Sequence, residues 1–139
     1  MIYYNVKTLS QTKKIAQEFA QIIKQKKQAI VFLKGDLGSG KTTFVRFVLH
    51  YLGIKDFKGS PSFTIAHEYY TKEKKVIHMD LYRIQTKEEL LNTGIFEYFD
   101  QVAIFFIEWP NLLEIKPDIV IEFNTTIKQR SIGIDWATN

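Results

Sequence analysis

The sequence predicts an α/β domain, a three-layer sandwich around a mixed, mostly parallel central sheet with an antiparallel C-terminal hairpin. Two observations carry this prediction. Residues 29–33 and 102–107 are short apolar runs with the length and continuous apolarity of strands buried on both faces. The first run leads into a glycine-rich loop and then into apolar residues at helical spacing. With 139 residues and 45% apolar content, the chain suits one compact domain over residues 1–139.

The first half of the chain contains two strands and two helices in alternation. Residues 2–6 resemble a short strand, and residues 8–10 offer side chains that can cap a helix. The apolar face expected for that helix comprises Ile15, Phe19, Ile22 and Ile23. After the loop, apolar residues recur at helical spacing from Phe44 to Leu52, and Gly53 follows as the expected C-terminal cap.

The second half is predicted to add four more strands and a short helical stretch around the apolar run at 102–107. These strands are expected at residues 63–70, 76–81, 119–123 and 131–136. The first two are joined through a turn at 72–75, and the last two form a hairpin across 124–128. Thr86-Lys-Glu-Glu89 is a capping-box pattern that opens the helical stretch towards Phe99.

Residues 35–42, Gly-Asp-Leu-Gly-Ser-Gly-Lys-Thr, match the phosphate-binding pattern G-x-x-x-x-G-K-[ST]. Glycines in this loop let backbone N–H groups curl around phosphates. Lys41 is a mobile positive charge for the terminal phosphates, and the Thr42 hydroxyl is a ligand for Mg²⁺. Because a strand precedes the loop and a helix follows it, we expect a P-loop NTPase-like fold that binds ATP and Mg²⁺.

A P-loop site also needs a carboxylate at the end of a neighbouring strand, to hold Mg²⁺ and orient the attacking water. Glu108 follows six apolar residues, and Asp80 follows a less apolar strand. The plainer interpretations are a solvent-facing acid for Glu108 and a structural pair with His78 for Asp80. His78 and Asp80 could instead begin a metal site, although no other histidine has supporting spacing. Trp109 is either a platform for the base or a core residue.

Charge and composition restrict the classes of function. Up to Gly59 there are 11 basic and 3 acidic residues (+8), and from Ser60 onward 8 basic and 12 acidic residues (−4). Lys13, Lys14, Lys24, Lys26 and Lys27 could meet RNA or an acidic partner, but a solvated helix face is the simpler interpretation. Only three arginines are present, which argues against direct nucleic-acid readout. With no cysteine, no long apolar run and no leader-like start, we expect a soluble cytoplasmic protein without membrane association.

Three other classes share parts of this pattern. A small kinase acting on a nucleoside or metabolite has the same loop, but such enzymes usually need several arginines around the transferred phosphoryl group. A GTPase would carry an Asn-Lys-x-Asp guanine motif, which the chain lacks. A nucleotide-binding interaction protein without turnover is the non-enzymatic alternative.

Five segments together resemble the bacterial TsaE family, formerly YjeE, the small ATPase of tRNA threonylcarbamoyladenosine biosynthesis. They are Gly35-Asp-Leu-Gly-Ser-Gly-Lys-Thr-Thr-Phe44, Ser60-Pro-Ser-Phe-Thr64, His78-Met-Asp-Leu-Tyr-Arg83, Gly94-Ile-Phe-Glu-Tyr-Phe-Asp100 and Ile107-Glu-Trp-Pro110. The last four are far more family-specific than the loop. Three residues depart from the family pattern. The family often has alanine at the position of Ser39 and threonine at the position of Ser62, and an acid is common at the position of Asn111.

The resemblance implies roles for individual residues. Lys41 would bind the β and γ phosphates, Thr42 and Glu108 would hold Mg²⁺, and Asp80 would position the attacking water. Residues 60–64 would form a nucleotide-sensing switch. The implied nucleotide-binding residues are Gly35, Asp36, Leu37, Gly38, Ser39, Gly40, Lys41, Thr42, Thr43 and Trp109, with Trp109 stacking on adenine.

The resemblance also implies partners. TsaE-like proteins work with TsaB and TsaD, and TsaD transfers the threonylcarbamoyl group to tRNAs that read ANN codons. ATP hydrolysis would reset that complex, and tRNA would be met only indirectly. We expect slow turnover by the isolated chain, because it has no obvious arginine finger, although Arg83 is a candidate.

Overall fold

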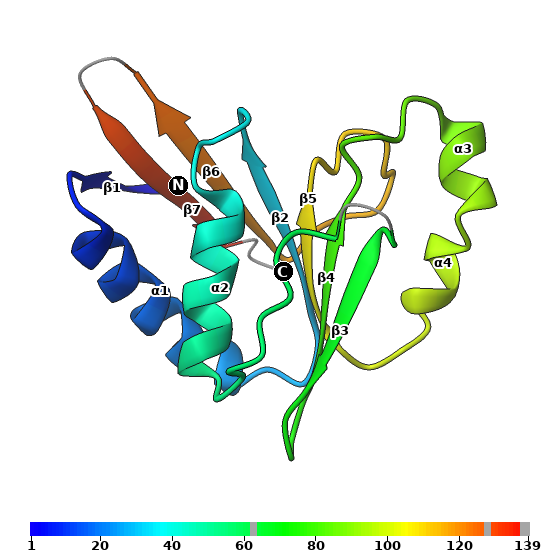
Figure 1. Ribbon diagram of the computed structural model, residues 1–139, viewed down its shortest axis with the longest axis horizontal. Helices are drawn as coiled ribbons and strands as arrows, with labels where there is room; N and C mark the ends of the chain where they lie inside the picture. Colours follow the sequence, from blue (N-terminus) through cyan, green and yellow to red (C-terminus); the bar gives the residue numbers. More distant parts are fainter. Residues whose placement is uncertain (62–63, 127–128, 137–139) are drawn as a thin grey trace.

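The computed structural model describes residues 1–61, 64–126 and 129–136. Over these residues, one seven-stranded sheet runs in the order β1-β7-β6-β2-β5-β4-β3 (Figure 1). The strands are β1 (Ile2–Val6), β2 (Ala29–Gly35), β3 (Ala66–Tyr70), β4 (Lys75–Asp80), β5 (Ile104–Glu108), β6 (Ile119–Thr125) and β7 (Arg130–Trp136). The helices are α1 (Leu9–Lys24), α2 (Lys41–Tyr51), α3 (Lys87–Asn92) and α4 (Ile95–Tyr98). None of the described helices combines the length and the apolarity needed to cross a bilayer.

The sheet is parallel at its centre and antiparallel at its edges. Strands β6, β2, β5 and β4 run parallel to one another. The pairs β1–β7, β6–β7 and β3–β4 are antiparallel. The mixed sheet and the C-terminal hairpin predicted from the sequence are therefore confirmed. Neighbouring parallel strands have their C-terminal ends on the same side of the sheet, and we call this side the edge. The segments that follow β2, β4 and β5 therefore come together there.

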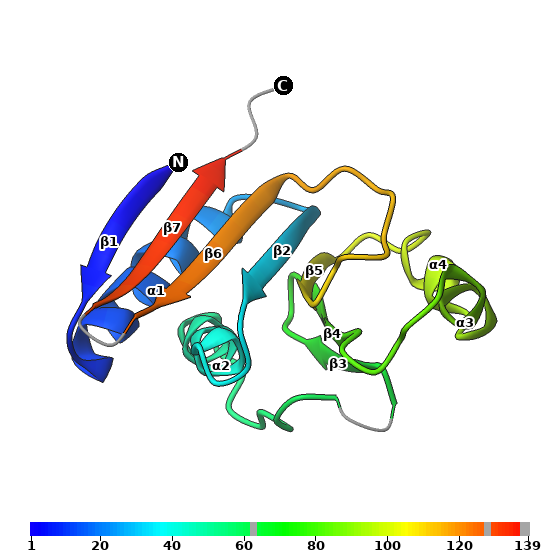
Figure 2. The same ribbon diagram turned by 90° about the horizontal axis from the view of Figure 1, so that it is seen from above.

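Two hydrophobic cores lie on opposite faces of the sheet, which makes the domain three-layered (Figure 2). Alternate residues of one strand enter different cores, as the period of two requires: Val31 and Leu33 pack in the core with α1 and α2, and Phe32 packs in the other. The second core is covered by α3 and α4, where Leu90 and Ile95 are buried.

Helix α1 begins where the capping residues predict, and three of the four residues expected on its apolar face, Ile15, Phe19 and Ile23, are buried. The Thr8 Oγ1 accepts from the Gln11 N–H at 3.3 Å, and the Gln11 Oε1 accepts from the Thr8 N–H at 3.2 Å, a reciprocal capping box. Ile22, expected in the core, is 44% exposed. The buried stripe of the helix includes Ala16 and Ala20 and leaves Ile22 outside it.

Several predicted boundaries shift by one to three residues. The strand expected from residue 63 begins at Ala66, and Phe63 itself lies outside the described residues. The helical stretch towards Phe99 is divided into α3 and α4 at Gly94, whose φ of 75° ends one helix and opens the next. In the C-terminal hairpin, β6 continues to Thr125, while residues 127 and 128 are outside the described part.

Candidate functional site

Three neighbouring parallel strands bring the predicted site residues to one edge of the sheet. In the registers of these strands, Glu108 at the end of β5 is the partner of Leu33 in β2 and of Asp80 in β4. The N–H of Leu81 donates to the Glu108 carbonyl at 3.1 Å, which keeps the two strand ends together. The glycine-rich loop leaves β2 at the same edge. Residues far apart in the sequence thus form one site.

The loop presents the uncapped start of α2. Gly40 precedes the helix with φ of 106°, a conformation that glycine adopts without steric cost. Among the described residues, no side chain caps this end, and the first turn contains no acid. Unpaired N–H groups and the positive end of the helix dipole therefore face the loop interior, which is the environment that phosphate groups favour.

Lys41 lies folded into the loop. Its ammonium donates to the Gly35 carbonyl and sits 3.7 Å from the centroid of the Trp109 ring. The residue is only 5% exposed, and burial lowers its pKa below the usual 10.5, although the carboxylates of Glu108 and Asp80 act in the opposite direction. A carbonyl dipole and an aromatic face thus hold a cation that phosphate oxygens would attract more strongly.

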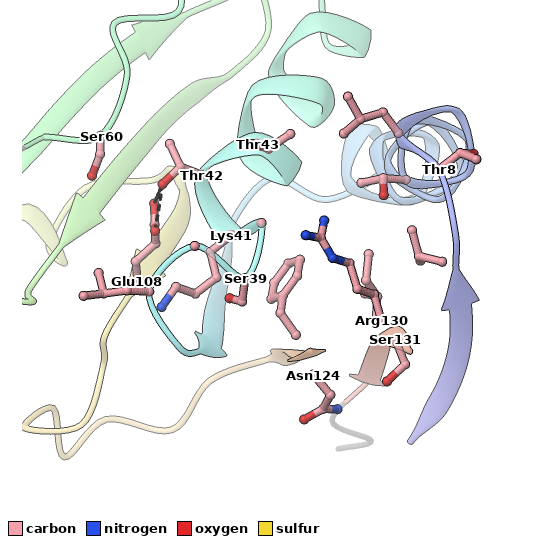
Figure 3. Close-up of a pocket in the computed structure, with 18 of the residues that line it drawn as sticks. Thr8, Ser39, Lys41, Thr42, Thr43, Ser60, Glu108, Asn124, Arg130 and Ser131 are labelled. Carbon is pink, nitrogen blue, oxygen red and sulfur yellow. Dashed lines mark hydrogen bonds between the residues drawn. The ribbon is translucent and has the colours of Figure 1, made fainter. Parts of the chain in front are cut away.

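Glu108 and Thr42 form the second half of the site (Figure 3). The Thr42 Oγ1 lies 3.0 Å from both carboxylate oxygens of Glu108, which is only 2% exposed. The interpretation of Glu108 as a solvent-facing acid is therefore wrong. A hydroxyl beside a buried carboxylate supplies hard oxygen ligands. This ligand set fits Mg²⁺, which binds proteins through one or two carboxylates and completes its shell with phosphates and water.

Asp80 occupies a separate position on the same edge. Its Oδ2 accepts from the Ser60 hydroxyl at 2.6 Å, and its Oδ1 accepts from the Tyr82 N–H at 2.9 Å. His78, the structural partner considered for Asp80, instead places Nε2 2.6 Å from the Glu108 Oε2. No group of three potential metal-binding side chains occurs in the described part of the chain, which argues against a protein-only metal cage at His78 and Asp80.

Trp109 adopts an unusual backbone conformation directly after Glu108. Its φ is 57°, a left-handed value that costs a non-glycine residue about 1–3 kcal/mol. The half-buried ring contacts the Lys41 ammonium and, at 4.9 Å between centroids, the Tyr82 ring. Its stacking on adenine stays a prediction, because the contacts of the ring described here are with Lys41 and Tyr82.

A cavity of about 590 Å³ extends from the ends of β4 and β5, past the loop, to the start of α1 and the antiparallel strands β6 and β7. It is lined at one end by Asp80, Glu108 and Trp109, and at the other by residues that sequence reasoning missed, among them Thr8, Thr12, Asn124, Arg130 and Ser131. Figure 3 shows the Arg130 side chain extending from the start of β7 into this space. Thr8 was predicted only as a helix cap. No local sequence pattern marks these residues, because they reach the loop only through the antiparallel pairing of β7 with β1 and β6. Arg83, the predicted finger candidate, is exposed and is not among the described lining residues.

The segment 57–60 is attached to the sheet beside the site at each of its residues. Phe57 stacks on the rings of Tyr69 and His78, and the Lys58 N–H donates to the Tyr69 hydroxyl at 2.9 Å. The Gly59 carbonyl lies 3.1 Å from the His67 Nδ1, and Ser60 donates to Asp80. Ser60, the first residue of the predicted switch, thus belongs to this attached segment, whereas Ser62 and Phe63 lie outside the described residues.

We expect His67 to make the fold less stable in mild acid. Burial lowers the pKa of His67 below its usual 6.5, and the hydrogen bond with Gly59 only partly offsets this effect. The unfolded chain therefore takes up a proton more readily, so stability is complete above pH 6.5 and decreases as the pH falls towards the lower folded-state pKa. Urea unfolding at about pH 7.5 and about pH 5.5 measures this loss. The His67→Gln variant should lose less stability between these two pH values. An equal loss in both proteins would show that His67 is not the cause.

We expect Gly35→Ala to distort the loop. A Cβ at Gly35 would meet the Phe123 carbonyl oxygen at 2.8 Å and the Ser39 Oγ at 2.6 Å, and the backbone oxygen cannot rotate away. Overpacking of this kind costs about 1–3 kcal/mol, measurable by urea unfolding. Ser39→Ala is the control: the Ser39 hydroxyl is buried without a hydrogen-bond partner among the described residues, so its removal should be neutral or slightly stabilising. Similar losses in both variants would refute this packing argument.

Comparisons of sequence support a common origin with known proteins. A sequence model of the family described as "Threonylcarbamoyl adenosine biosynthesis protein TsaE" matches residues 6–132. Relatives named "tRNA threonylcarbamoyladenosine biosynthesis protein TsaE" include one from Haemophilus influenzae, 39% identical over 99 residues, which are 69% of this chain and 63% of the relative. The relative from Bacillus subtilis is 41% identical over 61% of this chain and 52% of its own length. The relative from Aquifex aeolicus is 37% identical over 80% and 77% of the two chains. The match thus spans between half and two thirds of the first two relatives.

The structural comparison agrees with the sequence. The crystal structure of YdiB from Bacillus subtilis superposes with a TM-score of 0.73 at 30% identity, over 94% of this chain and 82% of that one. The family model covers most of the chain, including the loop, both acids and the start of the final strand. On these grounds the chain belongs to the TsaE family.

Proposed function

We propose that this chain binds ATP with Mg²⁺ and hydrolyses it in support of threonylcarbamoyladenosine modification of tRNA. The observation that carries the proposal is the contact of the Thr42 hydroxyl with both oxygens of the buried Glu108 carboxylate, at 3.0 Å. It joins the phosphate-binding loop to the acid of the neighbouring strand, as a nucleotide–metal site requires.

In the proposed complex, the N–H groups at the start of α2 and the Lys41 ammonium bind the phosphates. Thr42 and Glu108 hold the metal ion, whose chemistry is to neutralise charge on the β and γ phosphates. Asp80 is half-buried and already accepts two hydrogen bonds, which fix its carboxylate for orienting the attacking water. If Lys41 turned from the Trp109 ring to the phosphates, that ring would be free to contact the base.

The cavity offers a second position for the base. Its far end, lined by Thr8, Asn124 and Arg130, provides hydroxyl, amide and guanidinium groups that can hydrogen-bond a base or a ribose. Trp109→Ala and Arg130→Ala therefore separate the two placements: the substitution that weakens ATP binding but leaves inorganic triphosphate binding unchanged identifies the base contact.

The biological role proposed here is that of the relatives, whose name places them in tRNA threonylcarbamoyladenosine biosynthesis. The partners would be TsaB and TsaD, and ATP hydrolysis in the cytoplasm would reset their complex between turnovers. A loop that contacts the γ-phosphate differs between the ATP and ADP states and can thereby bias a partner. Transfer to tRNA would be carried out by TsaD, with tRNA meeting this subunit only indirectly.

The isolated chain should hydrolyse ATP slowly. An arginine that stabilises the transition state is worth about 10³–10⁵ in rate. Arg130 lines the cavity near α1, and Arg83 is exposed outside it. Partner binding that brings an arginine to the γ-phosphate would raise the rate, which is why we propose a weak ATPase stimulated by its partners.

ATP turnover by the purified chain, alone and with TsaB and TsaD of the same organism, tests the proposal. Lys41→Ala should abolish any stimulation, while Lys34→Ala, the same change at an exposed residue at the end of β2, should leave it unchanged. If the chain bound ATP but TsaB and TsaD did not raise its turnover, the proposal of a partner-stimulated ATPase would be refuted. Phosphorylation of an added nucleoside or sugar would favour the alternative, a small P-loop kinase.

A further inference from the structure

His78 is a buried polar residue to which the proposed chemistry assigns no part. It is 0% exposed, and its Nε2 lies 2.6 Å from the Glu108 Oε2. The other ring nitrogen, Nδ1, is buried without a hydrogen-bond partner among the described residues. A fully buried imidazole with one satisfied nitrogen costs free energy, so a purely structural role would be served better by an apolar side chain.

The Glu108 carboxylate needs a partner that stays in place when the site is loaded. Thr42 has a single hydroxyl proton, so it can donate to only one of the two oxygens at 3.0 Å. When this hydroxyl turns its lone pairs to a cation, Glu108 retains only one described side-chain donor, the His78 Nε2–H. With His78 holding Oε2, the other carboxylate oxygen, Oε1, stays directed towards Thr42.

The ring of His78 is enclosed in the sheet and covered by one aromatic ring. In the sheet His78 lies between Phe106 of β5 and His67 of β3. The Phe57 ring stacks on it at 6.0 Å with an interplanar angle of 22°. The side chain is fully buried, and a hydrogen bond to the Glu108 carboxylate requires that Nε2 carry a proton.

We infer that His78 is a positioning residue that holds the Glu108 carboxylate in the orientation needed to bind the metal with Thr42. The hydrogen bond runs from the Nε2–H to Oε2, and the proton stays on His78. The effect on metal affinity rests on the proposed function of the site, whereas the hydrogen bond and the position of the proton do not.

Two substitutions separate positioning from packing. His78→Gln can place an amide N–H near the position of Nε2, and His78→Leu fills similar space without a donor. Mn²⁺ affinity of the protein–ADP complex, measured by electron paramagnetic resonance of free Mn²⁺, should fall about 10- to 100-fold in His78→Leu. It should return to within a few-fold of the unsubstituted protein in His78→Gln. Equal Mn²⁺ affinity in both variants and the unsubstituted protein, with each shown to be folded by circular dichroism, would overturn the inference.

A second measurement needs neither a variant of His78 nor a working nucleotide site. Long-range ¹H–¹⁵N spectra of the unsubstituted protein distinguish the two tautomers of each histidine. His78 should carry its proton on Nε2, and the resonance of that proton should shift in Glu108→Gln. A proton on Nδ1 alone would refute the hydrogen bond with Glu108. Absence of Mn²⁺–ADP binding by the unsubstituted protein would instead count against the proposed function, leaving the tautomer result to decide the role of His78.

Discussion

Glu108→Ala is expected to reduce Mg²⁺-dependent ATP turnover about 10²–10³-fold, the effect of removing one preorganised electrostatic group from an active site. The carboxylate is buried and contacts Thr42 and His78, whereas both oxygens of Asp80, the other acid of this edge, accept hydrogen bonds from Ser60 and Tyr82. Phosphate release with TsaB and TsaD present measures the loss. Because the loop and Lys41 are unchanged, ADP binding without metal should persist, so the defect should appear in turnover and in the Mg²⁺ requirement.

The matched control is Glu114→Ala. Glu114 makes only a surface ion pair with Lys87, with 74% of its side chain exposed, and such pairs contribute little to stability. Its removal should leave turnover unchanged. If Glu108→Ala retained turnover within about three-fold of the unsubstituted protein, well short of the expected loss, Glu108 would not be a metal ligand, and Asp80 would be the remaining acid of this edge.

The parts of the site that lie on contiguous sequence could be predicted, because their geometry is local. The loop pattern fixes the path of its own backbone, and an acid after an apolar run marks the end of a buried strand, so Lys41, Thr42 and Glu108 were all identified and lie together in the structure. This works because parallel neighbours necessarily end at one edge of the sheet.

What could not be predicted depends on pairings between distant strands. Arg130 reaches the cavity because β7 is inserted between β1 and β6, an order that no local pattern specifies. The contact of His78 with Glu108 depends on the register of β4 on β5, and the sequence neighbourhood of His78 favoured Asp80 instead. Ile22 is expected in the core because its spacing fits, but the spacing does not show that Ala16 and Ala20 take the buried positions instead.

The same architecture identifies the side chain whose truncation should cost the most stability. Phe44 lies one turn into α2, is 0% exposed, and contacts the rings of Phe19 and Phe123 edge-on at 5.7 and 5.6 Å. It therefore joins α1, the sheet and the helix that carries the phosphate-binding loop. Phe44→Ala should lower the free energy of unfolding by about 3–5 kcal/mol, because three elements that meet at one ring cannot all close the resulting cavity. Urea unfolding followed by circular dichroism gives the value.

Phe96→Ala is the same chemical change on the other side of the sheet, at a residue of α4 that is 40% exposed. It should cost less than about 1 kcal/mol, because water already reaches the ring and little cavity forms. Subtracting the loss in unfolding free energy of Phe96→Ala from that of Phe44→Ala cancels the intrinsic effect of alanine in a helix. The remainder reports the packing of Phe44. If the two losses were equal, the core beneath α2 would not be what holds the loop in place. A loss confined to Phe44→Ala and accompanied by weaker ADP binding would show that α1 and the sheet stabilise the start of α2 for its ligand.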